Sequence, residues 1–186
     1  APKPGNLTMA EAATVSLSFL TAWNMLMHRA ELQAGETVLV QAGMSGVGSA
    51  AVQIARLIGA TVIATAGSTE KCQRVLELGA HHAINYREQD FSEAVAEATG
   101  GQGVSVILDS IGAAYLEQNL ASLAVGGRLL LIGLMGGASA EISLATLLSR
   151  RLQLIGSTLR ARSEAEKSGI VAAFEQRFGK DLEDGT

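Results

Sequence analysis

The chain has 186 residues, of which 48% are hydrophobic and 17% are charged, enough for one well-buried domain and few for two. Its formal net charge of −4 provides no positive field that would attract nucleic acid. No apolar run reaches the length of a membrane span, and the first residues lack a secretory signal pattern. The single cysteine, Cys72, excludes an internal disulfide and a site built from several thiolates. We therefore expect a soluble, cytoplasmic protein with neither nucleic acid nor membrane as a partner.

Short apolar strands alternate with helices along the whole chain. A helix is predicted first, over residues 11–29, before a turn at residues 34–36. Runs of β-branched and apolar residues then predict strands at residues 37–42, 61–66, 82–85, 104–109, 128–134 and 152–157. Helices are predicted between and after the strands, at residues 47–58, 68–78, from 90 onward, at 113–123 and from 163 to about 178.

The alternation of strands and helices predicts the fold. Parallel strands joined by helices of this length require right-handed crossovers. Two mononucleotide-binding halves in succession predict an α/β fold of the Rossmann type, a doubly wound six-stranded parallel sheet in the order 3-2-1-4-5-6. We find no short-period repeat and no low-complexity segment that would argue for another architecture.

Glycine and short polar residues mark the ends of several predicted helices. Gly59 is predicted to cap the C-terminus of the helix that follows the first strand. Asp90 with Glu93, and Ser163 with Glu166, have the spacing of a capping box.

A glycine-rich turn, Gly43-Met-Ser-Gly-Val-Gly48, lies between the first predicted strand and its helix. We expect Gly43 to allow a sharp turn and Gly48 to allow the helix to pack closely on the strand. Backbone N–H groups at the start of the helix, together with the helix dipole, attract a pyrophosphate. Ser45 stands where the dinucleotide-binding fingerprint has its middle glycine, but its hydroxyl can donate to a phosphate, and Gly46 can restore the close approach of the backbone. The turn therefore predicts a dinucleotide site.

The residues after the second predicted strand indicate which dinucleotide binds. A site for NAD places Asp or Glu there to hold the ribose 2′-hydroxyl, whereas this strand is followed by Gly67 and Ser68. Lys71 is close enough in sequence to hold a 2′-phosphate, and Glu70 falls in a first helical turn where an acid is ordinary. The alternative is that Ser68 is only an N-cap and Lys71 only a solvated charge. We predict NADPH as the cofactor.

No other group of residues has the spacing of a catalytic or metal site. His81 and His82 are adjacent, so in a strand their side chains point to opposite faces and cannot bind one metal together. We interpret both as residues at the edge of a strand. Asp109 is expected to orient the loop after its strand, and Cys72 to be an ordinary helix residue. We predict no metal site and no catalytic acid or base in this chain.

Seven runs follow one another in an order and spacing typical of one family, at residues 40–55, 65–68, 78–80, 84–86, 109–112, 133–136 and 156–160. They cover nearly all of the chain. They resemble the cofactor-binding domain of the medium-chain dehydrogenase/reductase superfamily, in its zinc-free, NADPH-dependent quinone oxidoreductase branch.

This resemblance implies cofactor contacts for a defined set of residues. The pyrophosphate would lie by Ser45, Gly46 and Val47, and Val47 would also contact the nicotinamide. The 2′-phosphate would be held by Gly67, Ser68 and Lys71, with Tyr86 beside it or beside the adenine. Ser110 and Ile111 would border the adenosine half. The nicotinamide would be framed by Thr21, Leu134, Met135, Ser157, Thr158 and Leu159.

The resemblance also implies an activity and a larger protein. The enzyme would transfer hydride from NADPH to a small-molecule acceptor, a quinone or a similar electron-poor compound. Residues 1–186 would form the dinucleotide-binding domain alone, inactive without an N-terminal catalytic domain and a C-terminal return segment. The alternatives are an enoyl or alkenal reductase module with the same cofactor domain, or a nucleotide-binding protein without turnover.

The last predicted strand lies at the edge of the expected sheet, with one side unpaired. Its residues, 152–157, are apolar, and Arg150 and Arg151 guard only its start. In the family that the chain resembles, such edges meet across a two-fold axis. We therefore expect a homodimer through this strand and the adjoining residues 135–148. The alternative is that this segment covers the edge and the domain stays monomeric.

Overall fold

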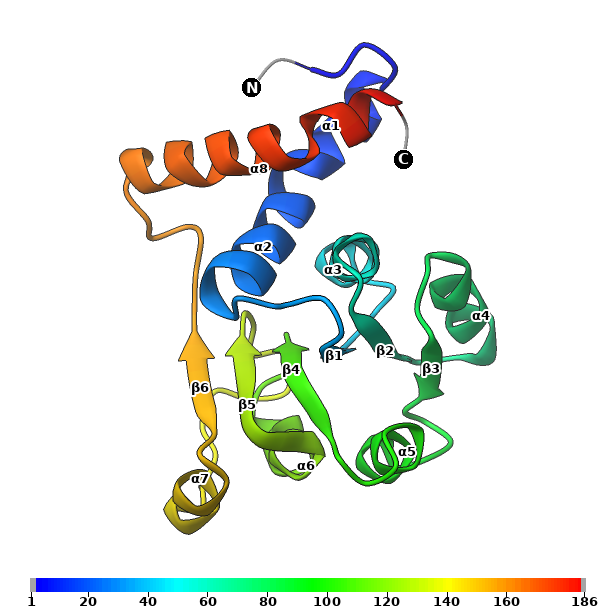
Figure 1. Cartoon of the computed structure of the whole chain (residues 1–186), viewed down its shortest axis with the longest axis vertical. Coiled ribbons are helices and arrows are strands. Elements are labelled where there is room, and N and C mark those ends of the chain that lie inside the picture. The colour runs from blue at the N-terminus through cyan, green and yellow to red at the C-terminus, as the bar shows by residue number, and fades with distance from the viewer. Residues whose placement is uncertain (1–2, 185–186) are drawn as a thin grey trace.

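The computed structural model describes residues 3–184 and contains a six-stranded parallel sheet in the order β3-β2-β1-β4-β5-β6 (Figure 1). The predicted fold class and strand order are confirmed. The strands are β1 (Thr37–Val40), β2 (Thr61–Ala66), β3 (His82–Asn85), β4 (Val104–Asp109), β5 (Leu123–Leu131) and β6 (Gln153–Gly156).

Helices cover both faces of the sheet. Successive residues of each strand point to opposite faces, so Val38 and Val40 of β1 join one apolar core while Leu39 joins the other. Figure 1 shows the first helix and α3 above the strands, with α5, α6 and α7 below them. The helices that connect successive strands are α3 (Gly46–Ile58), α4 (Thr69–Glu77), α5 (Phe91–Ala98), η3 (Ala113–Tyr115), α6 (Leu116–Ser122) and α7 (Leu144–Arg150).

The first helix is continuous from Met9 to Arg29 but changes its winding along its length. Its segments are α1 (Met9–Thr14), the π-helical η1 (Val15–Phe19), α2 (Leu20–Trp23) and the π-helical η2 (Asn24–Arg29). The helix α8 (Glu164–Asp184) lies across it, with the Trp23 ring centroid 5.2 Å from that of Phe178 (Figure 1). Within residues 3–184, no helix is long and apolar enough to cross a membrane.

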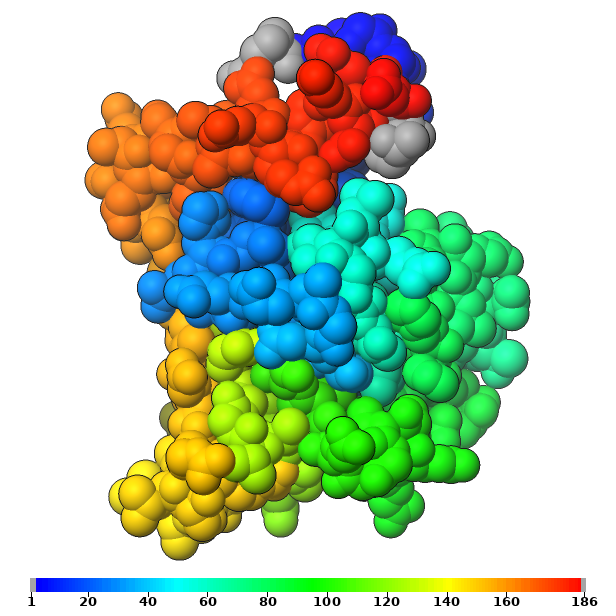
Figure 2. Space-filling view, viewed as in Figure 1, coloured from blue at the N-terminus to red at the C-terminus, as the bar shows by residue number. Residues whose placement is uncertain are grey.

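Strand β5, helix α8 and helix α7 differ from the sequence prediction. Strand β5 begins at Leu123, five residues early, because Leu123 pairs with Val104 before a register shift lets Arg128 pair with Val106. Gly126 and Gly127 therefore lie inside an irregular strand. Helix α8 continues six residues past the predicted end at Phe178. Helix α7 falls in a stretch without a predicted element, and with its neighbours it projects at the lower left in yellow (Figure 2).

The predicted helix ends are largely present. Gly59 adopts a left-handed conformation with φ 89° and caps α3. The Ser163 hydroxyl and the Glu166 carboxylate form both bonds of the predicted capping box. Asp90 caps α5 by accepting from the backbone N–H of Ser92 at 2.7 Å and of Glu93 at 3.3 Å, which is one half of the predicted capping box.

The Asp90 cap provides a test of helix stability with a defined pH dependence. Its hydrogen bonds, above all from the Ser92 side chain and also from Gln118, lower the pKa of the carboxyl despite partial burial. A lowered pKa means that the stabilisation is present above the pKa of the unfolded chain and is lost as pH falls through the folded pKa. Asp90→Ala should lower the free energy of unfolding by about 1 kcal/mol near neutral pH.

Urea unfolding across the acid range measures this difference. The control is Glu97→Ala, an exposed change on the same helix. The account fails if Asp90→Ala costs the same stability at every pH, or if Glu97→Ala costs as much.

Candidate functional site

The register of the sheet brings the carboxyl ends of its strands to one edge. Asp109 at the end of β4 pairs with Leu131, and Leu131 pairs with Gly156 at the end of β6. Every predicted site residue except Thr21 comes from the segments that follow these ends. These residues are Ser45, Gly46 and Val47 after β1, Gly67, Ser68 and Lys71 after β2, Tyr86 after β3, Ser110 and Ile111 after β4, Leu134 and Met135 after β5, and Ser157, Thr158 and Leu159 after β6.

The turn after β1 corrects one expectation. The left-handed residue is Ala42, with φ 53°, and not Gly43. Gly43 donates its backbone N–H to the carbonyl of Thr65 at 2.8 Å. A Cβ atom added at Gly43 would lie 2.9 Å from the Cβ of Ala64 and 2.9 Å from Cγ2 of Val75. Gly43 is therefore required for close packing and not for the sharp turn.

The start of α3 has the properties of an anion site. Ser45 is the N-cap, and its hydroxyl oxygen accepts from the Gly48 backbone N–H at 3.0 Å, which leaves the hydroxyl hydrogen able to donate. Gly46 and Val47 are the first two helical residues, and their N–H groups have no acceptor within the helix. A Cβ at Gly48 would overlap the carbonyl oxygen of Ala42, so only glycine lets the helix start so close to β1. The predicted role of Gly48 is confirmed.

The residues predicted at the adenosine end also lie near one another. Ser68 caps α4 and accepts from the Lys71 backbone N–H at 3.2 Å, so its interpretation as an N-cap is correct. A Cβ at Gly67 would lie 2.6 Å from the hydroxyl oxygen of Tyr86, which places the tyrosine against the end of β2. The Lys71 side chain is exposed, as is Glu70 beside it.

The loops after β4 and β5 form one unit. The Asp109 carboxylate accepts from the N–H groups of Ile111 at 2.6 Å and Gly112 at 3.0 Å, so its predicted role in orienting this loop is confirmed. Ile111 in turn accepts from Gly136, and Ser110 accepts from Met135. The residues predicted to border the adenosine half and the nicotinamide are therefore joined through their backbones.

Two polar groups in this unit are buried. Asp109 is fully buried, and burial raises the pKa of its carboxyl, partly offset by the hydrogen bonds from Ile111, Gly112 and Asn119. The Ser110 hydroxyl is buried and has no hydrogen-bond partner among the described residues. An unpaired buried hydroxyl beside the site is a group that a bound ligand could satisfy.

The loop after β6 and the first helix complete the edge. The Ser157 backbone N–H donates to Leu131 at 3.1 Å, and its hydroxyl accepts from Arg162 at 3.2 Å. Thr21 is half-buried, and Ser18 of the same helix approaches the glycine turn. The Ser18 hydroxyl oxygen lies 2.8 Å from the position of a Cβ at Gly46. The spacing from Thr21, three residues along one helix, is the signal that could have indicated Ser18.

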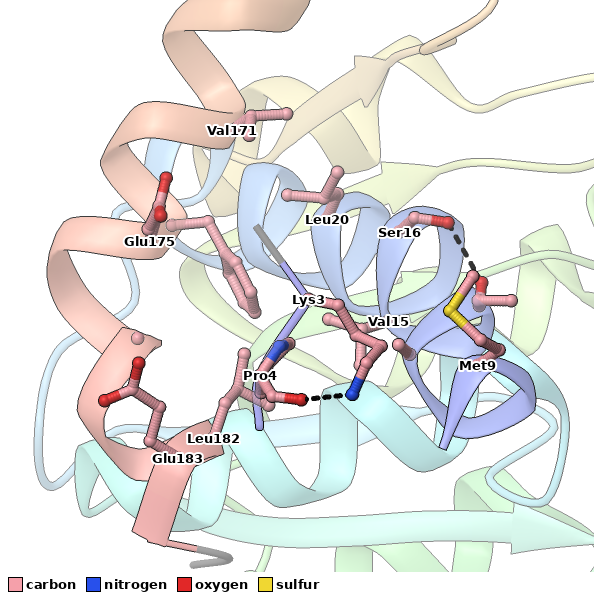
Figure 3. A pocket seen from close by; sticks show the side chains of 14 residues that line it. Lys3, Pro4, Met9, Val15, Ser16, Leu20, Val171, Glu175, Leu182 and Glu183 are labelled. Atoms are coloured by element: carbon pink, nitrogen blue, oxygen red, sulfur yellow. Dashed lines mark hydrogen bonds between the residues drawn. The ribbon is translucent and has the colours of Figure 1, made fainter. Parts of the chain in front are cut away.

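An apolar groove lies away from these loops. A groove of about 500 Å³ lies between two parts of the chain (Figure 3). One side is formed by Lys3 and Pro4 with the start of the first helix, and the other by the C-terminal half of α8. Its lining is mainly apolar, with Val15, Leu20 and Leu182 among the labelled side chains. The glycine turn does not line this groove.

The surroundings of His81 and His82 are those of structural residues. His81 accepts from the Val62 backbone N–H through Nδ1 at 2.9 Å, and burial together with the Arg56 charge lowers the pKa of its ring. His82 begins the edge strand β3 and is exposed, so its interpretation as a strand-edge residue is confirmed, whereas His81 lies directly before the strand. Across residues 3–184, no three His, Cys, Asp or Glu side chains come together in a way that could hold a metal ion.

A known protein family matches most of this chain. The profile of a family described as zinc-binding dehydrogenase matches residues 46–175, from the start of α3 to the middle of α8. The chain belongs to this family. The fold and the relatives below place it in the medium-chain dehydrogenase/reductase superfamily, as the sequence predicted.

The curated relatives include quinone oxidoreductases. A bovine (Bos taurus) quinone oxidoreductase-like protein 2 is 38% identical over 82% of this chain. The human (Homo sapiens) quinone oxidoreductase is 33% identical over 92% of it. The chain spans about half the length of these relatives, 44% of the bovine protein and 52% of the human one.

Solved structures with the same fold carry different names. A mycobacterial protein in complex with NADPH is 33% identical with a TM-score of 0.86, over 97% of this chain and 56% of its own. An enoyl reductase, CurK, is 34% identical with a TM-score of 0.84, over 97% and 55%. An NAD-dependent alcohol dehydrogenase is 40% identical with a TM-score of 0.84, over 100% and 51%. These relatives support an oxidoreductase domain with a nicotinamide cofactor.

The contact between Gly48 and Ala42 generates a prediction for the site. Gly48→Ala should lower the free energy of unfolding by about 1–3 kcal/mol, because a methyl group would push α3 away from β1. The matched control is Gly169→Ala on α8, where a Cβ meets nothing within 4 Å. That change should stabilise the protein by about 0.5–1 kcal/mol, because alanine favours a helix.

Urea unfolding of both variants gives the comparison. If both changes were equally stabilising, the close approach of α3 to β1 would not depend on glycine.

Proposed function

We propose that this chain is the NADPH-binding domain of an oxidoreductase that transfers hydride to a quinone or a similar electron-poor acceptor. The observation that carries the proposal is the start of α3, where a close approach permitted by glycine presents free N–H groups beside the carboxyl ends of the strands. Bound NADPH would supply the hydride, from C4 of its nicotinamide.

The residues at the edge of the sheet suit the parts of this cofactor. The N–H groups of Gly46 and Val47 and the Ser45 hydroxyl would hold the pyrophosphate, and the buried Ser110 hydroxyl would gain a partner. Gly67, Ser68 and Lys71, with Tyr86, would hold the adenosine end. Ile111, with Ser110, would border the adenosine half. The remaining proposed contacts, around the nicotinamide, are Thr21, Leu134, Met135, Ser157, Thr158 and Leu159.

The end of β2 favours NADPH over NADH. No carboxylate follows Ala66 directly, whereas Ser68 and Lys71 provide a hydroxyl and a cation for a 2′-phosphate. Among the structures of the same fold, one is a complex with NADPH and another is named an NAD-dependent dehydrogenase. The choice of cofactor therefore depends on the residues of this chain.

Quinone is the acceptor favoured by the curated relatives, and an activated alkene is the alternative favoured by the enoyl reductase structure. NADPH oxidation by the whole protein, assayed with quinones and with enoyl thioesters, separates the two. We propose that this chain contributes cofactor contacts and neither a metal ligand nor a catalytic acid or base. Positioning of the acceptor would then fall to other parts of the protein.

The cofactor choice has a direct test in Lys71→Ala. The wild-type domain should bind NADPH at least about tenfold more tightly than NADH, because a charge-assisted contact to the 2′-phosphate contributes about 1.5–3 kcal/mol. Lys71→Ala should remove most of this preference and leave the Kd for NADH unchanged.

Calorimetry with each dinucleotide measures the four constants. Lys180→Ala on α8 removes an exposed lysine far along the chain from the site and should change nothing. Equal affinities for NADPH and NADH in the wild-type domain would contradict the proposed cofactor.

We also propose a homodimer through β6. Among the described residues this strand pairs with β5 alone, so its other side is an edge. The neighbouring segment exposes large apolar side chains, with Met135 73% and Leu148 81% exposed. Exposed apolar groups beside a free strand edge are typical of an interface between copies of a chain.

Sedimentation equilibrium tests this proposal. The wild-type protein should be a dimer, and Leu148→Glu should shift it toward monomer by placing a charge in the interface. Leu57→Glu, an exposed position on α3, is the control that should leave the dimer intact. A wild-type monomer at high concentration would refute the interface.

A further inference from the structure

Four polar side chains lie buried beneath the proposed cofactor surface. Thr65, Asn119 and Asp109 are 0% exposed, and Gln41 is 2% exposed. Thr65 lies in β2, Gln41 directly follows β1, Asn119 lies in α6 and Asp109 ends β4. Buried polar groups are costly unless each is satisfied, so their connections carry information.

The four side chains form one continuous chain of hydrogen bonds. The Thr65 hydroxyl donates to Oε1 of Gln41 at 2.7 Å. Gln41 Nε2 donates to Oδ1 of Asn119 at 2.9 Å. Asn119 Nδ2 donates to Oδ2 of Asp109 at 3.1 Å.

Both ends of the chain are attached to loops of the proposed site. At one end, the Ala42 backbone N–H donates to Oγ1 of Thr65 at 3.1 Å, and Ala42 is the left-handed residue of the glycine turn. At the other end, Asp109 accepts from the N–H groups of Ile111 and Gly112. The chain therefore connects the pyrophosphate turn with the loop after β4.

The direction of every bond in this chain is fixed. A carboxylate only accepts, so Asn119 must turn its NH₂ group to Asp109 and its oxygen to Gln41. Gln41 must then donate to Asn119 and accept from Thr65, whose oxygen remains to accept from Ala42. Reversal of any one amide would set two donors or two acceptors against each other, which makes the arrangement a single orientation and not one of several.

We propose that Thr65, Gln41, Asn119 and Asp109 are positioning residues for the dinucleotide. They hold the glycine turn and the Ile111–Gly112 loop in one fixed relation, so that both contact the same cofactor. The inference rests on the proposed function, because it assigns both loops to the NADPH site. Apolar side chains of the same shape would fill this space without fixing the loops.

The test compares three threonine variants of β2. Thr65→Val keeps the shape but removes the hydroxyl, and Thr65→Ser keeps the hydroxyl. Thr61→Val is the matched control, since Thr61 begins the same strand and its side chain has no hydrogen bond among the described residues. Each variant is compared at a temperature below its own unfolding transition, so that only folded protein is measured.

Two readouts separate positioning from stability. Thr65→Val should raise the Kd for NADPH about tenfold, while Thr65→Ser and Thr61→Val should stay within about twofold of wild type. The Kd for adenosine 2′-monophosphate, which has no pyrophosphate, should stay within about twofold in all variants. In the ligand-free protein, the amide resonances of Ile111 and Gly112 should shift in Thr65→Val and not in Thr61→Val.

The outcomes also separate this inference from the proposed function. A wild-type domain that binds no NADPH would contradict the proposed function. The Ile111 and Gly112 amide resonances would still show whether loss of the Thr65 hydroxyl changes the loop at the other end of the chain of hydrogen bonds. A wild-type domain that binds NADPH, with Thr65→Val binding equally well or leaving both resonances unmoved, would overturn the inference alone. If Thr65→Val does not fold, Gln41→Met breaks the same chain with a side chain of similar length and is subject to the same criteria.

Discussion

The approach of α3 to the end of β1 is the contact on which the proposed site depends. Gly48 lies so near the carbonyl oxygen of Ala42 that a side chain there would overlap it. This contact brings the first turn of the helix over the carboxyl edge of the sheet, with the N–H groups of Gly46 and Val47 exposed beside it. The net charge of the protein is negative, so the attraction for a phosphate must come from local dipoles and from Lys71 rather than from the overall field.

Because the strands are parallel and in register, the loops after several strands lie beside this turn and form a larger surface with it. Because Asp109, Leu131 and Gly156 are paired, the loops after β4, β5 and β6 begin at the same level. Backbone bonds join the loops after β4 and β5, and the buried side chains from Thr65 to Asp109 join the first of these loops to the glycine turn. The edge of the sheet thus offers an extended ligand several loops that are fixed relative to one another. The alternation of strands and helices places these loops, and buried hydrogen bonds fix them.

Much of this arrangement is predictable from the sequence because it depends on local patterns. Strands β2, β3 and β4 have their predicted bounds, since each is a short apolar run with clear flanking turns. The cap at Gly59 and the packing role of Gly48 follow from glycine at fixed positions in a strand-turn-helix unit. The site residues that follow each strand share this origin, although their contacts with a cofactor remain predictions.

The differences arise where distant residues decide the outcome. The early start of β5 depends on the pairing of Leu123 with Val104, which no pattern within residues 123–128 indicates. The left-handed conformation falls on Ala42, and Gly43 is instead needed where the chain packs against Ala64 and Val75, a contact between three elements. The bond from Gln41 to Asn119 joins residues 78 positions apart, so their common role is visible only in the folded chain.

The central claim is that a nicotinamide dinucleotide lies over the start of α3, and amide chemical-shift mapping with NADPH tests it most directly. The account predicts the largest shifts at Gly46 and Val47, at residues 67–71 and at Ile111, with saturation at a single affinity. Shifts confined instead to Val15, Leu20 and the C-terminal half of α8, around the groove of Figure 3, would contradict it.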